Sequence, residues 1–305
     1  MKFPSFILIV SALLMLISNG AYRRAVFVSA EQKLNGVEIT DEERMEKNGN
    51  SWDYDEIRRR VFIMSVGLHD VGKLSVPLEI MDKATRLGSR LEIIEERFVK
   101  LNLLNRIAML EGRITAEAYD RAVEEAEDTL AFIRRVNGTG FLPDEDLKKV
   151  QELAAKTFTD EEGITQRLLT DEEITMLSIR KGTLTAQERS QMQGHAASTW
   201  NILSQVQFPD DYANVPGWAA SHHELLNATG YTRGLSGDKI PREVRLLTIL
   251  DIFEALTAKD RPYKPPIPLE KAWKILDSMV QEGALDGEML AEFRESGAWE
   301  QVLNG

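Results

Sequence analysis

The sequence contains no cysteine, so disulfide bonds, thiolate nucleophiles and cysteine-ligated metals are excluded. Positive charge is also scarce, because 37 lysines and arginines stand against 49 aspartates and glutamates, for a formal charge of −12. A chain with this balance lacks the broad cationic surface by which proteins bind nucleic-acid polymers, and we expect no such partner. Any anionic ligand must instead be attracted by a local group of cations.

The first 20 residues contain an apolar run whose length does not settle its role. A helix that spans a bilayer needs about 20 apolar residues, and the apolar run at residues 6–17 is shorter than that. Three interpretations stay open for it: a signal peptide, a membrane anchor, or a buried helix that starts the folded core. We treat residues 1–50 as a separate N-terminal segment. The missing cysteines fit a cytoplasmic protein, which residues 6–17 would attach to the inner membrane if they form an anchor.

The alternation of apolar and polar residues that marks β-strands is nearly absent, whereas helical spacing recurs throughout. We therefore predict an all-α fold, and 305 residues with 43% hydrophobic content suffice for a sizeable core. An apolar stripe from Ile57 to Leu68 leads directly into His69 and Asp70. It predicts a helix that ends near Gly72 and carries this pair at its inner end.

A long segment without histidine interrupts this pattern at about residues 84–176. Its apolar stripe from Leu87 to Leu101 has coiled-coil-like spacing. Gly112 then breaks the helix, and Thr115 is suited to cap a second one. We predict a helical hairpin inserted into one domain that spans residues 51–305. Such stripes are usually packing surfaces, so a hairpin without a function of its own is the simpler alternative.

Histidine is rare, with only four in 305 residues, and each lies in a context suited to metal binding. Together with two aspartates they offer imidazole and carboxylate ligands, which bind ions such as iron, manganese or zinc. These ions lower the pKa of bound water. Taken singly, each residue has a simpler explanation as part of the core, whereas jointly they favour a metal centre. The six residues are His69, Asp70, His195, His222, His223 and Asp251.

Two local patterns indicate that members of this set point inward. Thr185–Glu188 has the form of a capping box, which starts a helix whose apolar face includes His195. Pro241 opens another helix that is apolar on nearly all sides and contains Asp251. Because an unpaired buried carboxylate is costly, Asp251 should face a cation or hydrogen-bond donors.

These residues and the motifs around them resemble the HD superfamily of metal-dependent phosphohydrolases, and more narrowly the HD-GYP family of bacterial cyclic-di-GMP phosphodiesterases. The resemblance covers roughly residues 57–80 and 177–300. It implies an HD-domain helical bundle in which the helical hairpin is an insertion. The motifs that carry it are His69–Lys73, Gly182–Arg189 leading to His195, His222–Glu224 followed by Gly230-Tyr231, and Asp251–Lys264.

The resemblance also implies a role for each residue. Asp70 would be catalytic and would bridge two divalent ions, iron or manganese by preference, with His69 and Asp251 on one ion and the other three histidines on the second. Water activated by the ions would attack phosphorus in a cyclic dinucleotide and give pGpG and GMP. Lys73 would bind phosphate or assist the leaving oxygen, and Glu224 would orient a metal-bound histidine. The expected substrate contacts are Gly230, Tyr231, Arg261 and Lys264.

The sequence departs from the family at the loop that gives it its name, which reads Gly230-Tyr231-Thr232 in place of Gly-Tyr-Pro. Without proline the loop loses a fixed φ angle beside the ligands. No metal ligand is changed, which favours turnover of cyclic-di-GMP. Two alternatives stay open. One is a catalytically weak or inactive signalling protein that binds nucleotide or a protein partner, including a second copy of itself; the other is an HD phosphohydrolase for another nucleotide.

Overall fold

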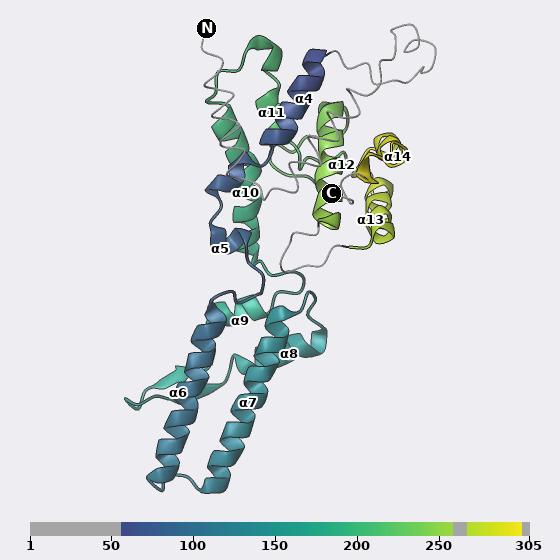
Figure 1. Ribbon diagram of the computed structural model, residues 1–305. Coiled ribbons are helices and arrows are strands. Elements are labelled where there is room, and N and C mark those ends of the chain that lie inside the picture. Colours follow the sequence, from purple (N-terminus) through teal and green to yellow (C-terminus); the bar gives the residue numbers. More distant parts are fainter. Residues whose placement is uncertain (1–55, 259–266, 301–305) are drawn as a thin grey trace. The chain divides into compact units, whose positions relative to one another are not determined.

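The computed structural model describes residues 56–258 and 267–300 (Figure 1). The chain divides into two compact units: the first joins the residues up to Val76 to those from Met192 onward, and the second comprises Pro77–Gln191. Helices dominate both units, and the described residues contain only one two-stranded sheet. The prediction of an all-α fold is therefore confirmed.

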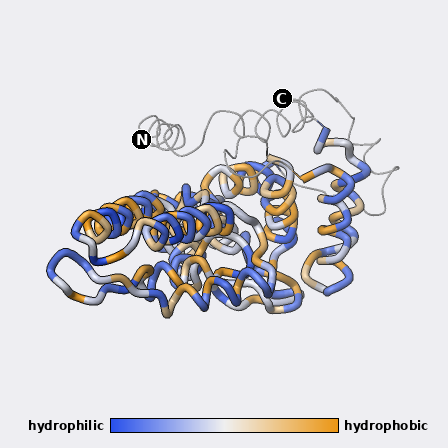
Figure 2. Tube along the Cα trace, turned by 90° about the horizontal axis from the view of Figure 1, so that it is seen from below, coloured by the Kyte–Doolittle hydropathy of each residue, from blue (hydrophilic) through white to orange (hydrophobic). Residues whose placement is uncertain are grey.

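Along the described helices hydrophobic and hydrophilic residues follow one another at short intervals (Figure 2), as in helices that bury one face. No helix within residues 56–258 and 267–300 is both long and apolar enough to cross a membrane. The apolar run at residues 6–17 lies outside these ranges, and its three interpretations remain predictions.

The first unit consists of short helices packed around two hydrophobic clusters. α4 packs against α11, and α12 packs against α11, α13 and α14. One cluster includes Val61 and Leu68, and the other contains the contacting rings of Phe253, Trp273 and Phe293, of which the two phenylalanines meet edge to face. The elements of the unit are α4 (Glu56–Leu68), the 3-10 helix η1 (Val71–Ser75), the C-terminal part of α10 (Ala186–Leu203), η2 (Asp210–Tyr212), α11 (Val215–Ala220), η3 (Gly237–Lys239), α12 (Arg242–Thr257), α13 (Leu269–Gln281) and α14 (Gly287–Glu295).

The helix before the His69-Asp70 pair ends earlier than predicted. α4 ends at Leu68 and η1 follows, whereas the apolar stripe predicted a helix that reaches about Gly72. Lys73 N donates to the carbonyl oxygen three residues earlier, at 2.9 Å, which is the bond of a tighter turn. His69 and Asp70 therefore lie on the turn between α4 and η1.

The second unit contains the predicted hairpin, in which the long helices α6 and α7 lie side by side (Figure 1). Thr115 caps α7 as predicted, because its side chain accepts a hydrogen bond from Ala118 N. Ile94, Phe98 and Ile133 are buried between elements of this unit. The limits proposed for the insertion, residues 84–176, remain a prediction. The elements are α5 (Leu78–Met81), α6 (Arg90–Leu110), α7 (Ala116–Gly138), α8 (Asp144–Leu153), β1 (Thr157–Thr159), β2 (Thr165–Arg167), α9 (Asp171–Leu177) and the start of α10.

α10 begins at the predicted capping box. Glu188 N donates to Thr185 Oγ1 at 3.2 Å, and Thr185 N donates to Glu188 Oε2 at 2.8 Å. Lys83 Nζ also donates to Glu188 Oε1, at 2.7 Å. The capping box and Lys83 together fix the start of α10. Further along the helix the side chain of His195 is buried, as its position on the apolar face predicted.

Candidate metal centre

All six residues predicted as metal ligands belong to the first unit, and the structure brings them into one cluster. They come from four segments of chain that are far apart in the sequence: the turn after α4, the helix α10, the turn after α11, and the helix α12. Three of the four imidazoles are fully buried and the fourth is partly buried. The residues, in chain order, are His69, Asp70, His195, His222, His223 and Asp251.

Three of the imidazoles are oriented in the same way. His69, His195 and His222 each place Nδ1 at 2.7 Å from the carbonyl oxygen three residues earlier. A carbonyl oxygen can only accept, so Nδ1 carries the proton and donates in each case. The remaining nitrogen, Nε2, is therefore the atom that faces the centre of the cluster and can bind a cation.

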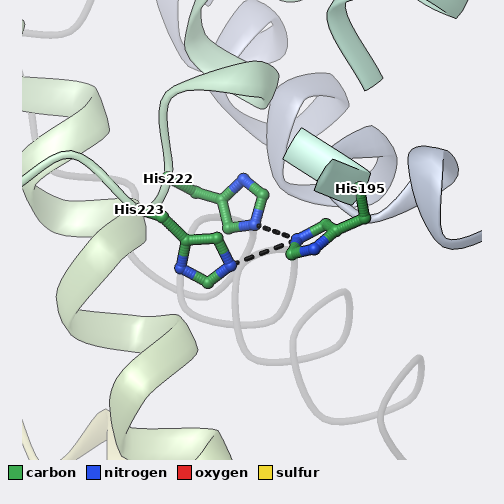
Figure 3. A group of neighbouring side chains, drawn as sticks. All are labelled: His195, His222 and His223. Carbon is green, nitrogen blue, oxygen red and sulfur yellow. Dashed lines mark hydrogen bonds between the residues drawn. The ribbon is translucent and has the colours of Figure 1, made fainter. Parts of the chain in front are cut away.

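The Nε2 atoms of His195 and His222 face each other, and neither carries a proton, because Nδ1 is the donor in both rings. His195 Nε2 lies 3.2 Å from His222 Nε2 and 3.1 Å from His223 Nε2 (Figure 3). Asp70 Oδ1 lies 3.4 Å from His195 Nε2 and 3.8 Å from His222 Nε2. This oxygen is buried and has no hydrogen-bond partner in the described part of the chain. Electron pairs that face each other in a buried space repel, and a cation among them reverses the sign of the interaction.

The second oxygen of Asp70 belongs to a second group of ligand atoms. His69 Nε2 lies 3.3 Å from Asp70 Oδ2 and 3.6 Å from Asp251 Oδ1. Asp251 Oδ2 in turn lies 3.8 Å from His223 Nδ1. Metal-ligand atoms of His69, Asp70 and His222 also fall within 4.8 Å of one another. One carboxylate with an oxygen in each of two neighbouring donor groups is the arrangement that a bridging ligand requires.

The charges in the cluster leave three of the four imidazoles in their neutral, metal-binding form. Burial lowers the pKa of His195 and His222, and it lowers the pKa of His223 to about 4, so these imidazoles are neutral at pH 7. Burial also opposes a charge on His69, yet Asp70 and Asp251 raise its pKa to about 10. The two carboxylates thus stabilise a positive charge at His69 Nε2, which a proton or a metal ion can supply.

Lys73 lies beside the cluster, and its side chain forms an ion pair with Asp70. Its Nζ donates to Asp70 Oδ2 at 2.5 Å, and its side chain is partly exposed. His69 and Lys73 together hold the pKa of Asp70 well below its usual value, against the effect of burial. Lys73 can reach a phosphate only by leaving Asp70, so its predicted role in substrate binding requires a cation that takes over the charge of this carboxylate.

Thr199 holds the turn that carries His69 and Asp70. The sequence analysis did not identify Thr199 as a residue of the site. Its buried Oγ1 donates to His69 O at 2.8 Å and accepts from Gly72 N at 3.0 Å. The backbones approach so closely that a Cβ on Gly72 would lie 1.9 Å from His195 O. The hydroxyl of Thr199 and the absence of a side chain at Gly72 therefore let the turn after α4 lie directly against α10.

The predicted substrate residues divide into two pairs. Gly230 and Tyr231 lie beside the paired histidines: the ring of Tyr231 is 4.6 Å from that of His223, and Tyr231 N donates to His223 O at 3.2 Å. A Cβ on Gly230 would lie 2.4 Å from Leu225 N, so the loop is tightly folded there. The second pair, Arg261 and Lys264, lies outside the described residues.

The expectation for Glu224 is wrong. Its buried carboxylate accepts hydrogen bonds from Arg233 N at 2.6 Å and from Leu235 N at 2.8 Å. It therefore holds the end of the loop that follows the paired histidines. The histidines do not need it, because backbone carbonyls already accept the Nδ1 protons of three of them.

Thr232, which replaces the proline of the family motif, has φ 112°, in the region that side chains other than glycine avoid. Proline is fixed near φ −65° and cannot adopt this conformation. We expect Thr232→Gly to raise the free energy of unfolding by about 1 kcal/mol, since it removes strain of roughly 1–3 kcal/mol and loses some chain entropy. Thr232→Pro should lower it. Urea denaturation measures both, and equal stability of the two variants would contradict the strained conformation.

Comparisons with known proteins agree with this geometry. Residues 169–289 match a family model described as an HD domain. This range holds His195, the His222-His223 pair and Asp251. It leaves out the His69-Asp70 pair, which the helical hairpin separates from the rest in the sequence.

Three curated relatives share part of the chain. The 3'3'-cGAMP-specific phosphodiesterase 3 of Vibrio cholerae is 36% identical over 117 residues, 38% of this chain and 24% of that protein. The 3'3'-cGAMP-specific phosphodiesterase 1 of the same organism is 40% identical over 72 residues, 24% of this chain and 16% of that protein. A cyclic di-GMP phosphodiesterase of Thermotoga maritima is 34% identical over 101 residues, 33% of this chain and 27% of that protein. The chain thus spans no more than 27% of the length of any of the three.

Proposed function

Since the chain belongs to the HD-GYP family of HD-domain proteins, we propose that it is a metal-dependent phosphodiesterase that hydrolyses cyclic di-GMP to pGpG and GMP. One observation carries the proposal. In a buried cluster, His195, His222 and His223 direct ring nitrogens at one another, and Asp70 adds an oxygen that has no hydrogen-bond partner in the described residues. Such a donor set has no purpose in packing and fits a divalent cation.

The proposed centre holds two divalent ions, with iron or manganese as the first candidates. Asp70 would contribute to both, His69 and Asp251 to one, and the remaining three histidines to the other. Bound ions of this kind lower the pKa of water and withdraw charge from phosphoryl oxygens. Mixed imidazole and carboxylate ligands suit iron and manganese, although zinc accepts the same donors.

The side chains around the centre would divide the remaining work. Lys73, released from Asp70 once the carboxylate is neutralised, would bind a phosphate oxygen or give a proton to the leaving oxygen. Arg261 and Lys264 would hold the phosphates, because a substrate with two negative charges approaches a chain of net charge −12. Tyr231 would present its ring, which packs on His223, as the wall of the substrate site. Such a protein would act in the cytoplasm, either free or anchored through residues 6–17.

A second candidate substrate is 3'3'-cGAMP. Two relatives of the chain are named for this cyclic dinucleotide, and they share 36% and 40% identity with it over the aligned residues. The metal centre acts on the phosphodiester group, which both substrates share. The loop after His223, which differs from the family motif at Thr232, would then distinguish the bases.

Turnover by the metal-loaded full chain tests the proposal. We expect protein loaded anaerobically with iron, or with manganese, to bind about two ions per chain and to convert cyclic di-GMP to a linear product that chromatography detects. Parallel reactions with 3'3'-cGAMP rank the two substrates by kcat/KM. Metal binding without hydrolysis of either dinucleotide would contradict the proposed activity. Calorimetry with the same nucleotides would then show whether the chain is a nucleotide-binding signalling protein.

A further inference from the structure

The loop at residues 225–235, which follows the paired histidines, contains two strained positions. Ala228 has φ 63° and Thr232 has φ 112°, so both place a side chain in the backbone region that favours glycine. Strain of this kind persists only where the surrounding structure holds the backbone in place, and it is common in loops that bind ligands. The contacts that hold the 225–235 loop therefore bear on its function.

Both ends of the 225–235 loop are tied to neighbouring groups. At the far end, Glu224 accepts hydrogen bonds from Arg233 N and Leu235 N. At the near end, Leu226 N donates to Ala284 O at 2.9 Å, in the turn that joins α13 to α14. The two strained positions lie between these ties, so the backbone cannot relax at one of them without breaking a contact at an end.

The side chain of Asn227 adds a contact at the near end that uses both a donor and an acceptor. Its Oδ1 accepts from Thr229 N at 3.1 Å and from Thr229 Oγ1 at 2.6 Å, and its Nδ2 donates to Glu282 O at 3.1 Å. A backbone N–H only donates and a carbonyl oxygen only accepts, so these two partners leave the amide one orientation. A carboxylate could keep the contacts with Thr229 but could not donate to Glu282 O.

The acceptor of this contact lies at the C-terminal end of a helix. α13 ends at Gln281, and Glu282 follows it as the C-cap. The last carbonyl groups of a helix have no partner within it, and they carry the negative end of its dipole. Asn227 Nδ2 supplies a donor to one of them, whereas an aspartate would bring a negative charge to the same place. The tie at the near end of the loop therefore depends on the amide.

We propose that Asn227 is a positioning residue for the dinucleotide substrate, which acts through the 225–235 loop. The loop carries Tyr231, whose ring lies 4.6 Å from that of His223 and whose N donates to His223 O. By tying the loop to the turn before α14, Asn227 holds this ring where a substrate at the metal centre would meet it. The inference rests on the proposed function, because it names a residue that sets the loop by which the two dinucleotides would be distinguished.

Asn227→Asp tests the tie, because it removes the donor and keeps the acceptor. Hydrogen exchange of the full chain without added metal should be about three- to tenfold faster at the amides of the 225–235 loop, as expected for the loss of one hydrogen bond. The amides of α12 should exchange at the wild-type rate. Asn214→Asp is the matched control, since Asn214 is exposed in the same unit, makes no capping hydrogen bond, and changes the charge equally. It should exchange as the wild type does throughout.

Kinetics of the metal-loaded chain test the role in substrate binding. Asn227→Asp should raise KM for cyclic di-GMP by about three- to tenfold and leave kcat and metal content unchanged, since its described contacts include no candidate ligand. A contact that serves stability alone would leave KM unchanged.

Two results would overturn the proposal. One is wild-type exchange of the loop amides in Asn227→Asp, and the other is faster exchange with an unchanged KM. If the wild-type chain hydrolyses neither dinucleotide, the proposed activity fails by itself. The exchange rates then still decide whether Asn227 holds the loop, and calorimetric Kd values for the two dinucleotides take the place of KM.

Discussion

Asp70→Asn is expected to abolish hydrolysis of cyclic di-GMP and to remove most of the bound metal. Asp70 Oδ1 lies 3.4 Å from His195 Nε2, and Asp70 Oδ2 lies 3.3 Å from His69 Nε2, so one side chain serves both donor groups. Asparagine keeps the shape but removes the charge, and its amide nitrogen cannot bind a cation. The loss in kcat should exceed the roughly 10²–10³-fold cost of deleting one charge-stabilising group. Elemental analysis and product chromatography measure the two effects.

Asp211→Asn is the matched control for this variant. Asp211 is an exposed residue of the same unit, and the substitution changes the net charge of the chain by the same amount. It should keep full metal content and activity. If Asp70→Asn retained both ions, Asp70 would not be the bridging ligand. If it lost metal while the wild-type chain turned over neither dinucleotide, the metal centre would stand and the substrate assignment would fall.

The members of the cluster could be predicted from the sequence because few residues of the chain are suited to bind a metal. With four histidines and no cysteine in the chain, the candidates for metal binding are few. The capping box at Thr185–Glu188 and the apolar surroundings of Asp251 then indicate which side chains point inward. The structure brings all six candidates together, and their role as ligands remains a proposal that metal analysis tests. Arg261 and Lys264 remain predictions for a different reason, since they lie outside the described residues.

The contacts of the residues that position the cluster could not be predicted from the sequence. Thr199 contacts His69 and Gly72 across more than a hundred residues of sequence, and no local pattern indicates such a contact. Glu224 was assigned by the general rule that carboxylates orient metal-bound histidines. The backbone carbonyl three residues earlier accepts the Nδ1 proton of His195 in α10, and the same spacing recurs at His69 and His222. The carboxylate of Glu224 therefore accepts from the loop backbone instead. Side-chain type can be read locally, whereas these contacts depend on the tertiary fold.

Gly72→Ala is expected to disrupt the metal centre without touching a ligand. The added Cβ would lie 1.9 Å from His195 O and 2.5 Å from Thr199 N, both of them backbone atoms of α10. The turn and the helix must separate, which should cost more than about 3 kcal/mol of unfolding free energy, since milder overpacking already costs 1–3 kcal/mol. The separation should also lower metal affinity by at least about 10–100-fold, as loss of supporting contacts commonly does. Chelator competition and urea denaturation measure the two quantities.

Gly194→Ala makes the same chemical change one residue before His195 and should have the opposite effect. A Cβ at Gly194 meets no atom within 4 Å, and the residue lies inside the helix α10. Alanine should therefore stabilise the chain by about 0.5–1 kcal/mol, because glycine is the poorer helix former. Metal affinity should stay at the wild-type value, since the backbone contact of Gly72 with α10 is preserved. If Gly72→Ala bound metal as tightly as Gly194→Ala does, the close approach of the turn to α10 would not be what positions His69 and Asp70, and the donor groups would have to be held by their own helices alone.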